Sequence, residues 1–418
     1  MTKYIKRFEL TSKYEEYINS DIALLPNVSL TNDNNIVHYN PIPNYLKFTA
    51  EEDNSTISLN SKTSPDMKYS LNGGEWAQWD YSTITLNTGD TVRMKGNNSN
   101  GFSTSESSYN QFQMKGKIGA SGNIMSLLYE DDFEGKLTIP CNYCFDHIFK
   151  NCTSLTNTPE LPATTLADYC YRAMFSGCTA LTNAPELPAT TLANNCYYSM
   201  FNGCTALTNA PELPATTLSY QCYSYMFNNC TSLTNAPELP ATTLAIDCYD
   251  NMFRGCTSLT NAPELPATTL ANNCYYGMFN SCTSLTNAPE LPATTLAIDC
   301  YDNMFRGCTS LTNAPELPAT TLTEYCYQNM FKGCTSLINA PELPATTLTE
   351  SCYSSMFGGC NKLNYVKMLA TDISADLCLN GWMGGVSSTG TFVKHPNMTS
   401  LPSGLSGIPT GWTVQDAA

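Results

Sequence analysis

The sequence predicts an α/β repeat solenoid with a 26-residue period, preceded by a small antiparallel β domain. The period is clearest in the cysteines, which form two series with a spacing of 26 residues. Eight full copies run from residue 152 to 359, with partial copies at both ends, as expected where terminal units shield a shared core. The first series is Cys170, Cys196, Cys222, Cys248, Cys274, Cys300, Cys326 and Cys352, and the second series is Cys178, Cys204, Cys230, Cys256, Cys282, Cys308 and Cys334.

Apolar residues at four-residue steps predict a helix of about ten residues in each copy. Thr190 or Thr191 suits the N-cap of this helix in the second copy. The residue before the second cysteine is glycine in six copies and Asn229 in a seventh, residues that tolerate the left-handed conformation ending a helix, and Ser281 is the exception. The apolar residues of the second copy are Leu192, Cys196, Tyr197, Met200 and Phe201, and Cys204 of the third copy continues the pattern.

The rest of each copy, Leu207 to Pro214 in the third, is too short and too rich in proline for another helix. It predicts a brief strand that stacks on its equivalents as a parallel sheet. Because proline removes a backbone donor, we expect the strand to end at or before Pro211.

Residues 45–128 alternate apolar and polar side chains between turn signals, which predicts the small antiparallel β domain. Trp76 and Trp79 within it fit either core and rim aromatics or a carbohydrate-stacking platform. The segment 116–123, GKIGASGN, is expected to be a loop entering the solenoid, which takes up residues 129–385.

The two ends of the chain are expected to serve the solenoid differently. Residues 1–44 combine a capping box at Ser12 and Glu15 with a hairpin pattern around Asn32 to Asn35, yet are too few to bury a core. They predict a leader that orders against a partner. Residues 386–418, rich in Gly, Ser, Pro and Thr, predict a C-terminal cap and tail.

The repeated pattern M-F-x-x-C-T-S-L-T-x-A-P-E-L-P-A-T-T-L resembles the BspA-type leucine-rich repeats of bacterial surface proteins and of phages that infect gut bacteria, over residues 137 to 385. The resemblance implies a leucine-rich-repeat solenoid used for adhesion and ligand binding, without catalysis. The leader portion PNVSL…VHYNP is similar to structural proteins of crAss-like phages.

Together these resemblances imply a virion protein, assembled in the host cytoplasm, whose leader contacts other virion proteins. Its solenoid would bind a host cell-surface polymer or protein. A bacterial cell-surface adhesin of the same repeat family is the alternative, and a homo-oligomer is left open.

Composition narrows the function. A net charge of -16 argues against nucleic acid as a partner, because phosphate binding needs clustered lysine and arginine. No apolar run is long enough for a membrane helix, and no apolar signal segment follows the N-terminal basic residues. With three histidines and no recognisable catalytic constellation, we expect neither an enzyme nor a cofactor. Four residues of types that bind zinc lie close together in the sequence: Cys141, Cys144, His147 and Cys152. They are better explained as positions of the repeat than as a metal site.

The cysteines are expected to be free thiols that pack as small apolar residues. The first series is expected at helix spacing, too far apart for disulfides, whereas the series nearest the strand is close enough to bridge. Eight tyrosines, Tyr171 and its equivalents, each follow a cysteine of the first series. We expect them to border the core with their hydroxyls outward.

One glutamate recurs in every copy and is the candidate ligand-binding group. Packing does not explain it, since stacked carboxylates repel each other. Either recent duplication preserved it and each carboxylate accepts a backbone N–H, or the row binds divalent cations such as calcium or a repetitive cationic ligand. Copies vary at helix positions opposite the apolar stripe, which we expect to form a second, solvent-facing surface; examples are Asp168, Tyr169, Arg172 and Ala173 in one copy and Asn194, Asn195, Tyr198 and Ser199 in the next. The glutamates are Glu160, Glu186, Glu212, Glu238, Glu264, Glu290, Glu316 and Glu342.

Overall fold

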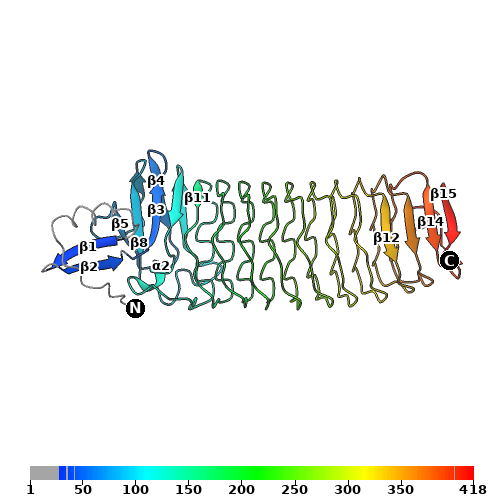
Figure 1. Cartoon of the computed structure of the whole chain (residues 1–418), viewed down its shortest axis with the longest axis horizontal. Helices are drawn as coiled ribbons and strands as arrows, with labels where there is room; N and C mark the ends of the chain where they lie inside the picture. The colour runs from blue at the N-terminus through cyan, green and yellow to red at the C-terminus, as the bar shows by residue number, and fades with distance from the viewer. Residues whose placement is uncertain (1–27, 34–35, 42, 400) are drawn as a thin grey trace.

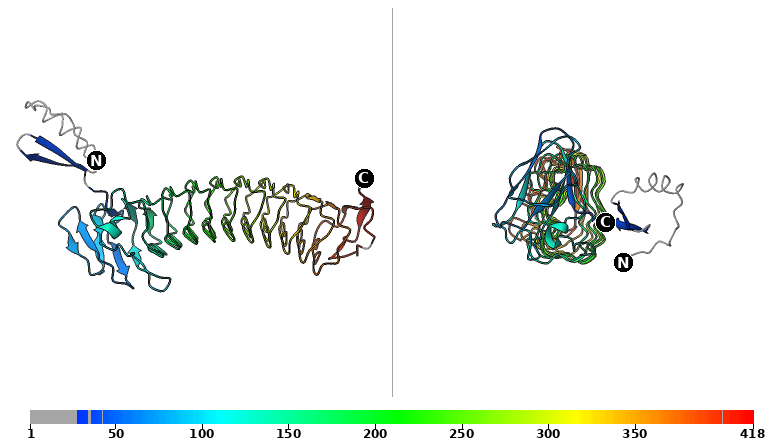
Figure 2. Two further views of the ribbon diagram at one scale, coloured as in Figure 1. Left: turned by 90° about the horizontal axis from the view of Figure 1, so that it is seen from below. Right: turned by 90° about the vertical axis from the view of Figure 1, so that its left-hand side faces the viewer.

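The computed structural model describes residues 28–33, 36–41, 43–399 and 401–418. They form an elongated molecule with antiparallel strands at one end, a row of stacked coils behind them and the C-terminus at the far end (Figure 1). The row curves gently, and the coils overlie one another when seen end-on (Figure 2). Strands β1 (Val28–Asp33) and β2 (Ile36–Pro41) pair as the hairpin predicted in the leader. The capping box at Ser12 and Glu15 lies outside the described residues.

The β domain consists of short antiparallel strands around an aromatic core. Burial alternates along β3 and β4, so that one face of each strand points inward. Phe48, Phe112 and Trp79 meet in the core, and Trp76 packs on Tyr45 at its rim, which agrees with core and rim aromatics. The elements are β3 (Leu46–Ala50), β4 (Ser55–Asn60), β5 (Lys68–Leu71), β6 (Ala77–Gln78), β7 (Ile84–Leu86), β8 (Thr91–Lys95), β9 (Gln111–Lys115), β10 (Ile118–Ser121) and α2 (Ser126–Tyr129).

The β domain and the solenoid share one sheet and one core. Strand β10 pairs antiparallel with β3 and parallel with β11 (Leu155–Asn157), the first strand of the solenoid. The expected loop at residues 116–123 is therefore wrong, because the segment contains β10. Phe149 of the first coil stacks on Phe112 at 5.4 Å between ring centroids, so the domain caps the open end of the solenoid.

Each coil contains a ribbon of consecutive β-turns where a helix was predicted. We call this segment the turn ribbon; in the first full coil it is residues 167–178. The backbone φ is positive at every fourth residue, as at Asn195, Ser199 and Gly203. A right-handed helix does not tolerate such residues. The helix prediction is therefore wrong, although the left-handed conformation expected before the second cysteine is confirmed, and Ser281 adopts it too.

Hydrogen bonds in the turn ribbon alternate between two kinds of partner. The Tyr171 N–H donates to the carbonyl of Cys196 in the next coil at 3.0 Å, whereas the Arg172 N–H donates to Tyr169 within its own turn at 3.2 Å. The same alternation continues through the following coils. Because each N–H finds a partner, the stacked turns satisfy the backbone without a helix, and coil-to-coil bonds hold the solenoid together.

The strand side of the solenoid is reduced to single bridges in the inner coils. Asn209 forms a single bridge with Asn235, and the equivalent asparagine of each following coil bridges to that of the next, as far as Asn339. Pro211 and Pro214 have no N–H, which explains why the ladder does not lengthen. The prediction that the strand ends before the proline agrees with these bridges but is wrong for β12 (Asn339–Leu343), which includes Pro341.

Side chains inside the coils stack into continuous ladders. The Phe175–Phe201 and Phe201–Phe227 ring centroids are each 5.6 Å apart, and the tyrosine that follows the first cysteine stacks at similar distances. These tyrosines are buried, so the expectation of outward hydroxyls is wrong; a ring placed between two coils has no route to solvent. The Tyr171 hydroxyl has no hydrogen-bond partner among the described residues.

All twenty cysteines are free, and all but Cys141 are buried. Thiols of the second series donate to the phenylalanine carbonyl of the preceding coil, as from Cys256 Sγ to the Phe227 oxygen at 3.1 Å. Burial raises the pKa of the Cys256 thiol to about 12. The first series lies in the turn ribbon, because the predicted helices do not form. The distance between packed helices was therefore the wrong reason to exclude disulfides within this series.

The C-terminal end returns to regular strands. Strands β13 (Tyr365–Met368), β14 (Gly390–Lys394) and β15 (Trp412–Asp416) continue from β12 as a four-stranded parallel sheet. Trp382 is buried beside Phe357 and ends the phenylalanine ladder, and its Nε1 donates to the Gly407 carbonyl at 3.0 Å. Residues expected to form a cap and tail thus also extend the sheet.

Candidate binding surfaces

The recurrent glutamates form one exposed row along the strand side of the solenoid, which we call the glutamate face. Within each copy, buried Leu and Ala alternate with exposed residues, as in Glu212, Leu213, Pro214 and Ala215. The alternation turns every carboxylate outward. Because the copies are in register, the row is set by the repeat itself and brings together all eight glutamates named from the sequence.

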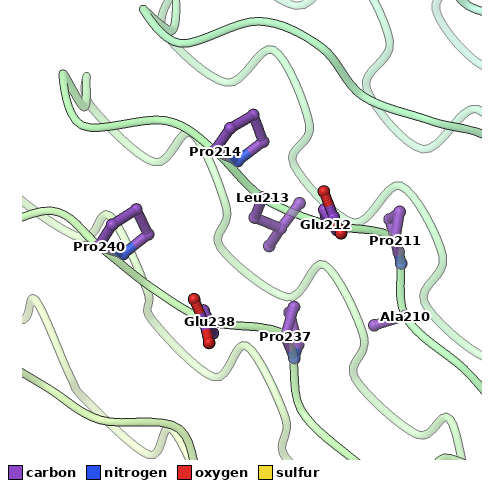
Figure 3. Close-up of a pocket in the computed structure, with 8 residues that line it drawn as sticks. All are labelled: Ala210, Pro211, Glu212, Leu213, Pro214, Pro237, Glu238 and Pro240. Atoms are coloured by element: carbon purple, nitrogen blue, oxygen red, sulfur yellow. The ribbon is translucent and has the colours of Figure 1, made fainter.

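A shallow groove separates successive carboxylates of the glutamate face. Figure 3 shows Glu212 and Glu238 at equivalent points of adjacent coils, each flanked by two prolines. The groove measures about 430 Å³. A groove of matching composition lies one coil earlier, around Glu186 and Glu212. Proline rings give these grooves rigid apolar walls, and each groove has one carboxylate from each of the two coils that line it.

Most carboxylates of this face have no partner in the described part of the protein. Glu160 accepts a hydrogen bond from Asn44 Nδ2 at 2.8 Å, and Glu342 pairs with Lys367 at 2.9 Å. Across the ranges that the structure describes, the six glutamates that lie between Glu160 and Glu342 in the row make no side-chain hydrogen bond or ion pair. None of the eight accepts a hydrogen bond from a backbone N–H there. The account in which each glutamate satisfies a nearby backbone group therefore has no support in these contacts.

The positions that vary between copies lie on the turn ribbon and are only partly exposed. Tyr220 and Ile246 at its outer edge are 44% and 49% exposed. In contrast, Asn195 and Ser199 are buried between coils, because the left-handed residues of one turn pack against the next. The expectation that all variable positions face solvent is wrong for these residues.

Two aspartates of the turn ribbon, Asp250 and Asp302, are unusual because they have no cationic partner within the described part of the chain. Asp302 is 4% exposed and accepts hydrogen bonds from Asn303 Nδ2 at 2.8 Å and Asn329 Nδ2 at 3.4 Å. Burial raises the pKa of Asp302 to about 7, with repulsion from Asp299 adding to it. Burial likewise raises the pKa of Asp250 to about 7.

The raised pKa values predict that the protein becomes less stable as pH rises from about 4 to about 7. The folded state binds protons that the unfolded state has released in this window, so ionisation favours unfolding. Asp302→Asn should therefore stabilise the protein by about 1–3 kcal/mol at pH 8 and have little effect at pH 4. Urea denaturation at both pH values measures this, with Glu75→Gln, at an exposed carboxylate outside the glutamate row, as the control. An equal effect of Asp302→Asn at both pH values would contradict the assignment.

A charged cluster joins the first coils to the β domain, and the sequence did not reveal it. The Asp146 side chain is fully buried and receives two bonds from Arg172, Nε to Oδ1 at 3.0 Å and Nη2 to Oδ2 at 2.8 Å. Arg172 Nη1 also bonds Glu106 of the β domain at 2.8 Å. The arginine varies between copies, and only the fold brings Glu106 to it.

The residues considered above as zinc ligands lie near this cluster and contact protein groups. His147 Nδ1 lies 2.6 Å from Asp146 Oδ1, and its ring stacks on Tyr109 at 4.7 Å. Cys152 Sγ donates to the Phe112 carbonyl at 3.1 Å. In the described ranges there is no group of three or more His, Cys, Asp or Glu side chains suited to a metal ion.

Comparison with known families decides what kind of chain this is. Residues 135–260 and 272–377 match the family described as BspA type leucine rich repeat region, with six copies. These segments make up more than half of the chain. The chain is a BspA-type leucine-rich-repeat protein. No curated protein and no solved structure matches this BspA-type protein.

Membership in the BspA-type family indicates a surface-binding or scaffold role, and such repeats are typically non-enzymatic. No helix among the residues that the structure describes is long and apolar enough to cross a membrane. The candidate surfaces of this BspA-type protein are thus the glutamate face and the outer edge of the turn ribbon.

Proposed function

We propose that this protein is a non-enzymatic recognition protein whose glutamate face binds a repetitive, cationic or cation-bridged polymer on a cell surface. The observation that supports this most is the run of six successive glutamates, from Glu186 to Glu316, that have no partner among the residues that the structure describes. Exposed carboxylates at a spacing of about 5 Å repel one another, and a ligand that brings positive charge relieves the repulsion.

Repetition suits weak contacts multiplied along the solenoid. Each groove offers two carboxylates, one from each adjoining coil, between proline walls, which is a small contact. Several grooves engaged by one chain act together, because the first contact raises the effective concentration for the next. Calcium is the simplest bridging ion, since it prefers several carboxylate oxygens and leaves room for ligand atoms.

We further propose that the protein belongs to a virion, with the leader at residues 1–44 contacting other virion proteins and the solenoid contacting the host. The similarity of the leader to structural proteins of crAss-like phages supports this placement. The BspA-type repeats fit a bacterial cell-surface adhesin equally well. Mass spectrometry of purified phage particles and of washed host envelopes separates the two, since each placement expects the protein in only one of these fractions.

The binding proposal predicts a response to calcium. Millimolar calcium should raise the melting temperature of the parent protein by mass action. A variant with Glu→Gln at Glu212, Glu238, Glu264 and Glu290 should lose most of that rise and bind host cells or their isolated polymer at least tenfold more weakly. Differential scanning fluorimetry and cell-binding titrations measure the two effects.

The matched control replaces exposed threonines of the same coils outside the grooves, Thr208, Thr234, Thr260 and Thr286, with alanine. This control should keep both the calcium response and cell binding. Equal stabilisation by sodium at matched ionic strength would show that calcium acts only by screening. Undiminished cell binding by the glutamine variant would exclude the glutamate face as the binding surface.

A further inference from the structure

Cys141 differs from every other cysteine of the chain in both position and exposure. It is the only thiol that is not buried. It also lies three residues before Cys144 of the first series, where the full copies carry alanine, serine or threonine, as at Ala167, Ser219 and Thr323. A Cys-x-x-Cys pair is therefore formed once, at the start of the solenoid.

The turn ribbon brings these two cysteines together. Residues 142–151 form the first turns of the ribbon, and Tyr143 within the Cys-x-x-Cys segment has the positive φ, 59°, typical of the ribbon. In the next coil the equivalent turn is closed by the Cys170 N–H, which donates to the Ala167 carbonyl at 3.3 Å. First and last Cα atoms of a β-turn are less than about 7 Å apart, within the range that a disulfide spans.

The electrostatics of the pair also distinguish it from the other thiols. A hydrogen bond with the Cys144 thiol lowers the pKa of Cys141, whereas burial raises the pKa of Cys144. The remaining thiols have no such neighbour within a turn, and those of the second series donate to phenylalanine carbonyls. A partly exposed thiol beside a buried one is the usual arrangement of an attacking and a resolving cysteine.

We propose that Cys141 and Cys144 form a reversible disulfide at the junction of the β domain and the solenoid, and that the other eighteen thiols do not take part. The Cys141 thiolate attacks one sulfur of a small-molecule disulfide such as glutathione disulfide, and one thiol leaves. The Cys144 thiolate then attacks Cys141 Sγ in the mixed disulfide and expels the second thiol. The pair loses two electrons and two protons, and the oxidant is reduced to two thiols.

The geometry favours a reversible bond over a structural one. The ring encloses only two residues, so it restricts the unfolded chain little and adds little to stability. The bond also lies at a packed contact, because a Cβ built on Gly101 would fall within 2.4 Å of Cys141 Sγ, and the Ser103 N–H donates to the Cys144 carbonyl at 2.9 Å. Oxidation should therefore be sensed by residues 101–103 of the β domain.

The test equilibrates the reduced, full-length protein in glutathione buffers of increasing oxidising strength. Acid quenching, alkylation and peptide mass spectrometry then locate any disulfide. The parent should form one disulfide, joining Cys141 to Cys144, and return to twenty alkylated thiols on reduction. A parent that stays fully alkylated, or a disulfide between other cysteines, would overturn the proposal.

The repeat supplies two matched variants. Cys141→Ala introduces the residue present at 167 and 193, so it should fold and form no disulfide. Ala193→Cys places a thiol three residues before Cys196 in an inner coil, and should give a second disulfide in the same buffers. Failure of Ala193→Cys to form that bond, with circular dichroism matching the parent, would overturn the claim that the turn geometry brings the thiols together.

Discussion

Phe227→Ala is expected to destabilise the middle of the solenoid by about 3–5 kcal/mol. Phe227 is fully buried, and its ring lies 5.6 Å from both Phe201 and Phe253. Its removal leaves a cavity that touches three coils. Because each coil contacts only its neighbours, the interruption should divide one cooperative unit into two. Urea denaturation followed by circular dichroism should show an earlier, broader transition.

Hydrogen exchange locates the effect of Phe227→Ala. Protection should fall first in the coils that contain Phe201 and Phe253 and persist near Trp382. Ile246→Ala, in the adjoining coil but at a side chain that is 49% exposed, is the control and should change stability by less than about 0.5 kcal/mol. A loss of less than 1 kcal/mol for Phe227→Ala would mean that the ladder does not hold the coils together.

Arg172→Ala is expected to destabilise the junction between the β domain and the solenoid by about 3–5 kcal/mol. The change leaves the buried Asp146 carboxylate without its two-bond partner and frees Glu106 on the other side. Arg172→Lys should recover only part of the loss, because a lysine cannot reproduce the paired contacts. Thermal denaturation of each variant measures the loss.

Asp146→Asn in the Arg172→Ala background separates charge from packing. If the unpaired carboxylate causes the loss, the double variant should be more stable than Arg172→Ala alone. Exposed Arg254→Ala is the control for loss of a positive charge. A double variant no more stable than Arg172→Ala would attribute the loss to the arginine's packing against Tyr143 and Tyr169 instead.

The sequence was sufficient for the repeat, its period and the residues that face the core. Cys196, Met200 and Phe201 were predicted to be buried and are. The element that carries them was misjudged because a helix and the turn ribbon both return a side chain to the same face after about four residues. A step of four that never shortens to three differs from the helical period of 3.6.

A second sequence signal distinguishes the turn ribbon from a helix. Asn, Asp, Ser or Gly occupies most of the positions with positive φ, such as Asn195, Ser199 and Gly203. Three such residues at a fixed step of four suit left-handed backbone and oppose a helix. At the last of the three positions alone, such a residue also suits the end of a helix, so the prediction of a helix followed from ignoring the first two positions.

The candidate surfaces were only partly predictable. The glutamate row follows from the period alone, and its exposure follows from the alternation around it. The proline-walled grooves depend on how adjacent coils meet, and the burial of Asp302 depends on Asn329 in the next coil. Contacts between coils involve residues 26 apart, and a single copy contains no information about which side chains they will enclose.

The alternating hydrogen bonds of the turn ribbon restrict how such a chain can change in length. Inserting one residue would exchange the two classes of N–H downstream, so that donors aimed at the next coil would point into their own turn. Adding 26 residues changes no partner at all. The identical segments that begin at Ala245 and Ala297 lie two periods apart, which fits copying in whole units. A gene of this design can lengthen its product by about 5 Å per added unit and inherit a finished interface each time.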